Sequence, residues 1–99
     1  MSRQGFQPMS HPAFFKLIIL GENEYEFWTD QLITHTLASA YSTGESILGA
    51  ENVYGYVIVR IEHDSWSVVG ECVYGCDYTV YEHNGKVSVK KGRDRLVMV

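Results

Sequence analysis

The dipeptide Asn84-Gly85 is the feature that most constrains how this chain can fold. Both central residues of a type I′ turn need a positive φ angle, and Asn followed by Gly accepts this well. The dipeptide therefore predicts an antiparallel β-hairpin that pairs Glu82 with Val87 and Val80 with Val89. The segment "RLVMV", residues 95–99, could add a last strand after this hairpin.

A second strand is indicated by the alternating segment "VYGYVIVRIEH", residues 53–63. Successive side chains of a strand point to opposite faces, so the segment should present two different surfaces. One surface carries Val53, Val57, Val59 and Ile61, and the other carries Tyr54, Tyr56, Ile58, Arg60 and Glu62.

The next two residues, Asp64-Ser65, can serve as a two-residue turn into another antiparallel strand. This turn would place Ile61 opposite Val68 and Val57 opposite Cys72. We expect that strand to run on from residue 66 to residue 82, with a bend or bulge at Gly75.

The N-terminal half predicts one strand and one helix. "FFKLIIL", Phe14 to Leu20, is rich in aromatic and β-branched residues and ends at a glycine. Asn23 can cap a helix with Glu26 three residues later, and Gly44 can end it, which predicts a helix over residues 24–42. Apolar residues recur within it at near-helical spacing, namely Tyr25, Trp28, Leu32, Leu37, Ala40 and Tyr41.

These elements predict an α+β fold with the order β-α-β-β-β, in which a single helix packs on one face of an antiparallel sheet of four to five strands. Ninety-nine residues are enough for one core only, and the apolar share of 45% is that of a globular domain. We expect a flexible leader over residues 1–12 and a single domain over residues 13–99. The pattern resembles no family motif, and many unrelated proteins share this layout.

The net charge of −4 conceals an asymmetry along the chain. Residues 1–85 carry three basic and eleven acidic side chains, whereas residues 86–99 carry five basic side chains and Asp94 alone. The basic end consists of Lys86, Lys90, Lys91, Arg93 and Arg95. An acidic body disfavours broad nucleic-acid binding, so only this basic end could contact a phosphate, an acidic partner or a second copy. It could equally be an edge strand that lysines protect from unwanted pairing.

No apolar run approaches the roughly 20 residues that a membrane-spanning helix needs. The N-terminal residues lack the apolar block of a secretion signal. We therefore expect a cytoplasmic protein.

Cys72 and Cys76 lie near His63 and His83, but their C-x3-C spacing differs from the tight knuckles of zinc sites. In a straight strand the two sulfurs would lie about 13 Å apart, too far for a disulfide or a shared metal. A tight loop between them would instead allow a disulfide. We expect buried, inert thiols and no metal or cofactor, because disulfides are scarce in the cytoplasm.

The sequence contains no nucleophile elbow, phosphate-binding loop, zinc-binding H-E-x-x-H or dinucleotide fingerprint. His63 and Asp64 are neighbours whose side chains would point apart on a strand end. No nucleophile, base and stabiliser can be placed together, so we do not expect an enzyme.

One helix can cover only one face of the expected sheet, and the opposite face would still be rich in tyrosine and valine. Exposed apolar patches of this kind usually mark contact surfaces, where tyrosine and arginine contribute most. The residues expected on this surface are Tyr54, Tyr56, Ile58, Arg60, Val69, Val73 and Tyr81. We therefore expect a non-enzymatic protein-binding module that docks on another protein through this face.

Three alternatives remain open. The chain's own ends could cover that face, or two such faces could pack together in a dimer. A small-molecule or nucleotide-binding pocket could also lie between helix and sheet, lined by Trp28, Tyr41, Trp66 and Tyr78. Within the binding-module hypothesis, the size, the charge and the lack of catalytic motifs suggest an inhibitor of a larger protein machine, for example a phage or mobile-element counter-defence protein.

Overall fold

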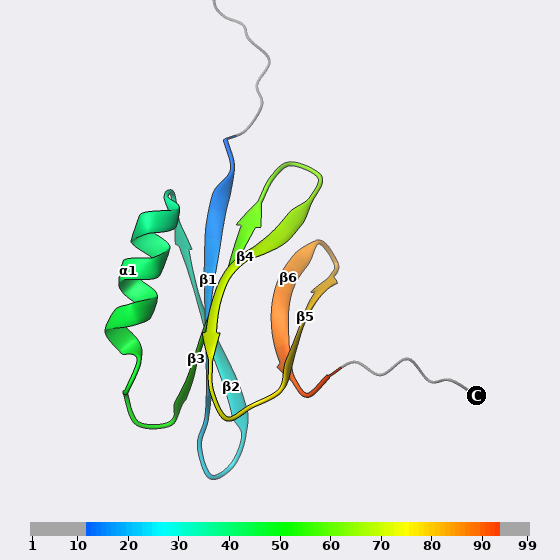
Figure 1. Ribbon diagram of the computed structural model, residues 1–99. Coiled ribbons are helices and arrows are strands. Elements are labelled where there is room, and N and C mark those ends of the chain that lie inside the picture. The colour runs from blue at the N-terminus through cyan, green and yellow to red at the C-terminus, as the bar shows by residue number, and fades with distance from the viewer. Residues whose placement is uncertain (1–11, 94–99) are drawn as a thin grey trace, which may run out of the picture.

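The computed structural model describes residues 12–93 (Figure 1). The predicted leader, up to residue 11, and the predicted strand at 95–99 therefore lie outside the described residues. The described elements are, in chain order, β1 (Phe14–Glu22), β2 (Phe27–Thr34), α1 (Leu37–Ile47), β3 (Val53–Ile61), β4 (Trp66–Val73), β5 (Tyr78–His83) and β6 (Lys86–Lys91).

The fold is α+β, with an antiparallel sheet and one helix, as the sequence predicts. Four strands form the main sheet in the order β2-β1-β3-β4, and β5 and β6 form a separate two-stranded sheet. The helix lies on one side of the main sheet and the β5–β6 hairpin lies on the other (Figure 1). The predicted β-α-β-β-β order is wrong, because a second strand precedes the helix.

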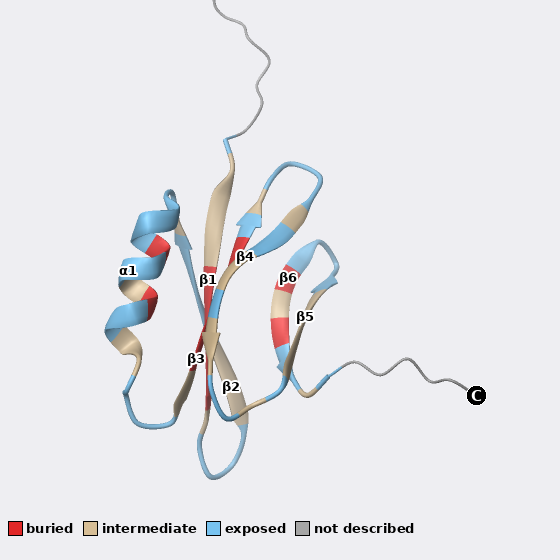
Figure 2. Cartoon of the chain, viewed as in Figure 1, coloured by how far each residue is buried: buried red, intermediate tan, exposed pale blue. Residues whose placement is uncertain are grey.

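Two apolar cores lie on the two faces of the main sheet. The helix-side core consists of Leu17, Ile19, Ala40, Tyr56 and Ile58. The hairpin-side core consists of Ile18, Leu20, Val57, Val59, Val87 and Val89. Figure 2 shows these buried positions on the central strands, on α1 and on β6. Both faces of β1 and β3 are buried, which explains the almost continuous apolar run in β1.

The predicted helix over residues 24–42 is wrong in its first half. Residues Phe27–Thr34 form β2, which pairs with β1 in one uninterrupted register. The Asn23 side chain does accept hydrogen bonds from the backbone N–H groups of Tyr25 and Glu26, at 2.8 and 3.0 Å. It thereby stabilises the turn between two strands, since an Asx turn and a helix N-cap use the same local bonds.

The helix begins later and ends later than the sequence pattern indicates. Thr36 is its N-cap and accepts a hydrogen bond from the backbone N–H of Ser39 at 3.0 Å. Gly44, the expected stop, is buried inside the helix, and the positive φ of 89° belongs to Gly49.

The hairpin at Asn84-Gly85 is confirmed in both conformation and register. The two residues have φ angles of 52° and 79°, as a type I′ turn requires. Glu82 pairs with Val87, and Val80 pairs with Val89.

The turn between β3 and β4 is centred on His63-Asp64, one residue earlier than the predicted Asp64-Ser65 turn. Ile61 pairs with Trp66, and the Glu62 N–H donates to the Ser65 carbonyl at 2.9 Å. A register shift at Ile58/Val59 then sets Val57 opposite Glu71.

The expected continuous strand from residue 66 to residue 82 is also wrong. β4 ends at Val73 and β5 begins at Tyr78, in a different sheet. Gly75, with a φ of 83°, lies in the connection where the chain passes from one layer to the next. Within residues 12–93, no helix has the length and apolar character needed to span a bilayer.

Candidate functional site

The sheet face that was expected to be exposed is covered by α1. Tyr56 is 1% exposed and Ile58 is fully buried, so the prediction that these two residues form a binding surface is wrong. The predicted partner of the helix, the face with Val57 and Val59, lies under the β5–β6 hairpin instead. The sequence reasoning counted one covering layer, whereas the structure has two.

The remaining residues of the predicted surface do not share one face. The backbone irregularity at Gly55, with a φ of 148°, places Tyr54 against the hairpin-side core together with Val73. The Tyr54 hydroxyl donates to Glu22 Oε1 at 2.7 Å, and this hydrogen bond is the main cause that raises the pKa of Tyr54. Val69 packs against the helix-side core, where Cys72 also lies.

Arg60 and Tyr81 are accessible but belong to different layers. Arg60 is exposed in β3 and forms an ion pair with Glu62. Tyr81 is half-buried in β5, on the side of the hairpin opposite to the core-facing Val80. The Lys90 ammonium lies 5.5 Å from the centre of the Tyr81 ring, within range of a cation–π interaction.

The basic residues of the predicted C-terminal patch lie at both ends of β6 and just beyond it. Lys91 forms an ion pair with Glu22 at 2.7 Å, and Arg93 approaches Asp77 at 3.6 Å. Lys86 lies at the other end of β6, and Arg95 is outside the described residues.

The prediction of one small-molecule pocket between helix and sheet is wrong, because its four lining residues lie on opposite sides of the sheet. Trp28 packs on the helix-side core, and Tyr41 meets Tyr56 edge to face at a centroid distance of 6.3 Å. Trp66 and Tyr78 pack on the opposite side of the sheet.

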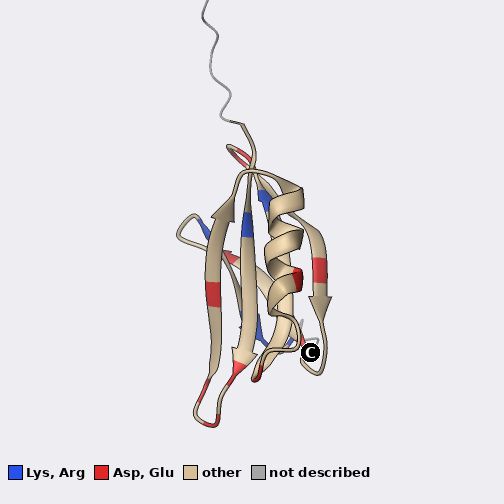
Figure 3. Cartoon of the chain, turned by 90° about the vertical axis from the view of Figure 1, so that its left-hand side faces the viewer, with Lys and Arg blue, Asp and Glu red and all other residues tan. Residues whose placement is uncertain are grey.

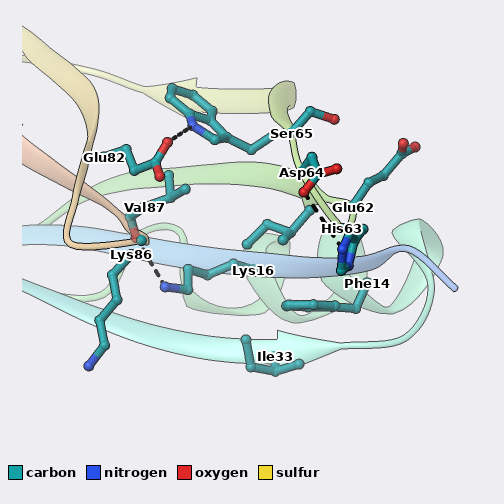
Figure 4. A pocket seen from close by; sticks show the side chains of 13 residues that line it. Phe14, Lys16, Ile33, Glu62, His63, Asp64, Ser65, Glu82, Lys86 and Val87 are labelled. Atoms are coloured by element: carbon teal, nitrogen blue, oxygen red, sulfur yellow. Dashed lines mark hydrogen bonds and ion pairs between the residues drawn. The ribbon is translucent and has the colours of Figure 1, made fainter. Parts of the chain in front are cut away.

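A hollow of about 490 Å³ lies instead between the main sheet and the tip of the β5–β6 hairpin. We call it the sheet–hairpin hollow. Its apolar lining consists of Phe14, Ile33, Ile61, Trp66 and Val87, and its polar lining of Lys16, Glu62, His63, Asp64, Ser65, Glu82, Gly85 and Lys86. Figure 4 shows these side chains converging from β1, β2, the β3–β4 turn and the hairpin.

Two hydrogen bonds join the walls of the hollow. The Lys16 ammonium donates to the Val87 carbonyl at 3.0 Å, and the Trp66 indole N–H donates to Glu82 Oε1 at 2.9 Å (Figure 4). Burial and, secondly, the positive charge of Lys86 lower the pKa of Lys16. The hollow therefore combines apolar walls with two neighbouring ammonium groups.

Within the described residues, the lining of the hollow brings His63 close to Asp64. His63 Nε2 lies 3.7 Å from Asp64 Oδ1, but both side chains are largely exposed to solvent. Over the described range 12–93, no three His, Cys, Asp or Glu residues are grouped as a metal site would require.

Both cysteines are free and half-buried. Cys76 lies in the β4–β5 connection, where its thiol contacts the Asp77 carbonyl at 3.1 Å. Burial raises the pKa of the Cys76 thiol, which lowers the fraction of reactive thiolate.

The sequence reasoning missed the hollow, although one signal was present. Lys16 interrupts the apolar β1 strand, and a charge on a strand buried on both faces needs a polar or open surrounding. Ile33 was assigned to a helix, so its position beside Lys16 could not be recognised; the two residues are direct neighbours across β1 and β2.

No protein-family model, curated protein or solved structure matches this chain.

Proposed function

We propose that this protein is a non-enzymatic protein-binding module whose sheet–hairpin hollow receives an apolar side chain from an acidic segment of a partner. The observation that carries this proposal is the combination of apolar walls with the ammonium groups of Lys16 and Lys86 in one hollow. An inhibitor of a larger protein machine could act in this way, by occupying a surface without any chemistry of its own.

The size and lining of the hollow suit an anchoring side chain. Its volume of about 490 Å³ lies in the range of ordinary binding pockets. Ile33 forms one wall and is 56% exposed, so a partner side chain would remove apolar surface from water. Interface hot spots are commonly residues that fill such a pocket, particularly where aromatic groups such as Phe14 and Trp66 line it.

The charges indicate the kind of segment that would bind. Three carboxylates line the hollow, and each has a neighbour: Glu82 accepts from Trp66, Glu62 is paired with Arg60, and Asp64 lies 3.7 Å from His63. Lys16 and Lys86 lie close enough for the charge of one to affect the other. A carboxylate beside the anchoring side chain would relieve this repulsion and orient the partner.

The test is selection of peptides from a random display library on the immobilised full-length chain. We expect enriched peptides to carry an apolar residue next to Asp or Glu. Their affinity should fall at least about tenfold for Lys86→Glu, the loss expected when about 1.4 kcal/mol of binding free energy is removed. Lys90→Glu is the matched control, because Lys90 is an exposed lysine of the same strand that does not line the hollow.

A second variant, Trp66→Leu, tests the apolar wall, with circular dichroism as the check that the fold is retained. Enriched peptides that bind Lys86→Glu and Trp66→Leu as tightly as the parent protein would contradict the proposal. So would a selection that enriches no sequence pattern at all.

A further inference from the structure

Strand β2 forms an open edge of the main sheet. It pairs with β1 over eight consecutive residue pairs, from Phe15 with Thr34 to Glu22 with Phe27. The sheet order places β2 outermost, so in the described part of the chain no strand pairs with its other side. Such an edge presents a row of N–H and C=O groups to which another strand can bind.

The two edges of the sheet differ in how well they are protected. β4, the opposite edge, has a register shift beside Val59, and such irregularities discourage pairing. β2, with the sequence FWTDQLIT, has no such irregularity, no proline and no lysine, and Asp30 is its one charge. In Figure 3, these two strands form the lateral edges of the sheet behind α1.

Large apolar side chains are exposed on both faces of β2. Leu32 is 42% exposed on the helix side, where it pairs with Leu17, and Ile33 is 56% exposed on the hairpin side. Leu37, 36% exposed at the start of α1, follows the end of β2 by three residues. The edge therefore offers apolar contacts together with backbone hydrogen bonds.

We propose that a second copy of this chain pairs with β2 in antiparallel fashion, about a two-fold axis that passes beside Leu32. The two sheets would then form one continuous sheet with α1 of both copies on the same side. Such a C2 contact uses the same surface on both copies, and further strands cannot add to the occupied edge.

The two-fold axis restricts the possible registers. Directly opposed residues of an antiparallel pair point to the same face of the sheet. When the two-fold axis is perpendicular to the sheet, one residue of β2 must lie opposite the same residue of the second copy. An axis at Asp30 would oppose two carboxylates, which is unfavourable. An axis at Leu32 opposes the two leucines, pairs Gln31 with Ile33 and sets Asp30 against Thr34, so no like charges face each other.

This self-complementarity favours a second copy over a foreign strand. The edge carries little charge, so it offers no electrostatic selection for a different partner. The net charge of −4 on each copy opposes association only over about 8 Å at physiological salt. Pairing of the two edges would cover exposed apolar surface on both copies.

One consequence of the dimer rests on the proposed function. A two-fold axis perpendicular to the sheet keeps both hairpins on one side, so the two sheet–hairpin hollows would open on the same side of the dimer. A partner with two anchoring segments could then bind both hollows and gain affinity from the linkage.

The test combines solution mass with register-specific cross-linking of the full chain. Light scattering after size exclusion should give twice the mass of one chain, and Leu32→Lys should give a single chain. In a background of Cys72→Ala and Cys76→Ser, Leu32→Cys should form an intermolecular disulfide, because opposed residues lie about 4.5–5.5 Å apart between Cα atoms.

Asp30→Cys is the matched control, because Asp30 faces Thr34 rather than itself in the proposed register. A monomeric mass at all concentrations, a dimer that Leu32→Lys leaves intact, or a faster cross-link for Asp30→Cys than for Leu32→Cys would each overturn the proposal. The two proposals are separable, because Lys86→Glu should weaken peptide binding without changing the mass. Leu32→Lys should change the mass without changing the affinity for a single peptide.

Discussion

Gly44 of α1 lies directly against the aromatic ring of Tyr56 in β3. A Cβ atom added at Gly44 would come within 2.9 Å of two ring carbons, closer than real Cβ contacts allow. The next residue, Glu45, accepts a hydrogen bond from the Tyr56 hydroxyl at 2.5 Å. One turn of the helix therefore contacts both the ring and the hydroxyl of the largest fully buried side chain.

This contact predicts the effect of Gly44→Ala. Alanine favours a helix over glycine by about 1 kcal/mol, but overpacking against the ring should cost about 1–3 kcal/mol. We expect a net loss of about 1 kcal/mol in the free energy of unfolding, measured by urea denaturation. Ser42→Ala, at an exposed position of the same helix, is the control and should be neutral or stabilising. If both substitutions stabilise the protein equally, the close packing of Gly44 on Tyr56 is wrong.

Tyr56 predicts a loss of stability at alkaline pH. Burial, and secondly the hydrogen bond to Glu45, raise the pKa of Tyr56 in the folded state. Above about pH 10 the tyrosine of the unfolded chain ionises while folded Tyr56 keeps its proton, so stability should fall as the pH rises. Tyr56→Phe should make this decline shallower, by up to about 1.4 kcal/mol per pH unit. Urea titrations at several pH values between 9 and 11 test it, and parallel curves for the two proteins would refute it.

Glu22 predicts a loss of stability at acidic pH. Hydrogen bonds from Lys91, first, and from Tyr54 lower the pKa of the Glu22 carboxyl, although the side chain remains accessible to solvent. The stabilisation is fully present at neutral pH and should be lost as the pH falls below about 4.3, the ordinary pKa of glutamate. Glu22→Gln should remove this component, so its urea midpoint should change less between pH 7 and pH 3 than that of the parent.

The same contact joins the end of β1 to the end of β6. Lys91→Met should therefore lower the free energy of unfolding at neutral pH, as Glu22→Gln should. High salt should weaken the contribution of this exposed pair in the parent protein but not in the Glu22→Gln variant. A salt response that is equal in both proteins would show that the pair does not stabilise the hairpin.

A substitution at Val89 tests whether the β5–β6 hairpin packs on the main sheet as part of the core. Its side chain is 4% exposed and packs on the hairpin-side core. Val89→Ala should lower the free energy of unfolding by about 2 kcal/mol, from lost burial and the cavity left behind. Lys90→Ala, at the neighbouring exposed position, should change it by about 0.5 kcal/mol or less. Equal effects in thermal or urea unfolding would mean that the hairpin does not cover the sheet.

Local chemistry accounts for what the sequence predicted correctly. The Asn84-Gly85 turn, its register and the strands β1 and β3 depend on backbone conformations and side-chain patterns of a few neighbouring residues. The same local rules failed over residues 24–34, because the hydrogen bonds of Asn23 suit a strand turn as well as a helix start. Pairing with β1 decided between them, and that contact is not visible in the segment itself.

The sequence by itself determined an antiparallel α+β domain with one helix and a type I′ hairpin, since turn geometry and alternation are properties of short segments. Only the tertiary structure decided that α1 covers the face with Tyr56 and Ile58, that the hairpin folds back over the face with Val57 and Val59, and that the hollow beside Lys16 stays open. The choice of layer depends on the change of direction at Gly75 and on burial of Val87 and Val89. These contacts join residues that are distant in the chain, and their free energy depends on the whole core rather than on any local pattern.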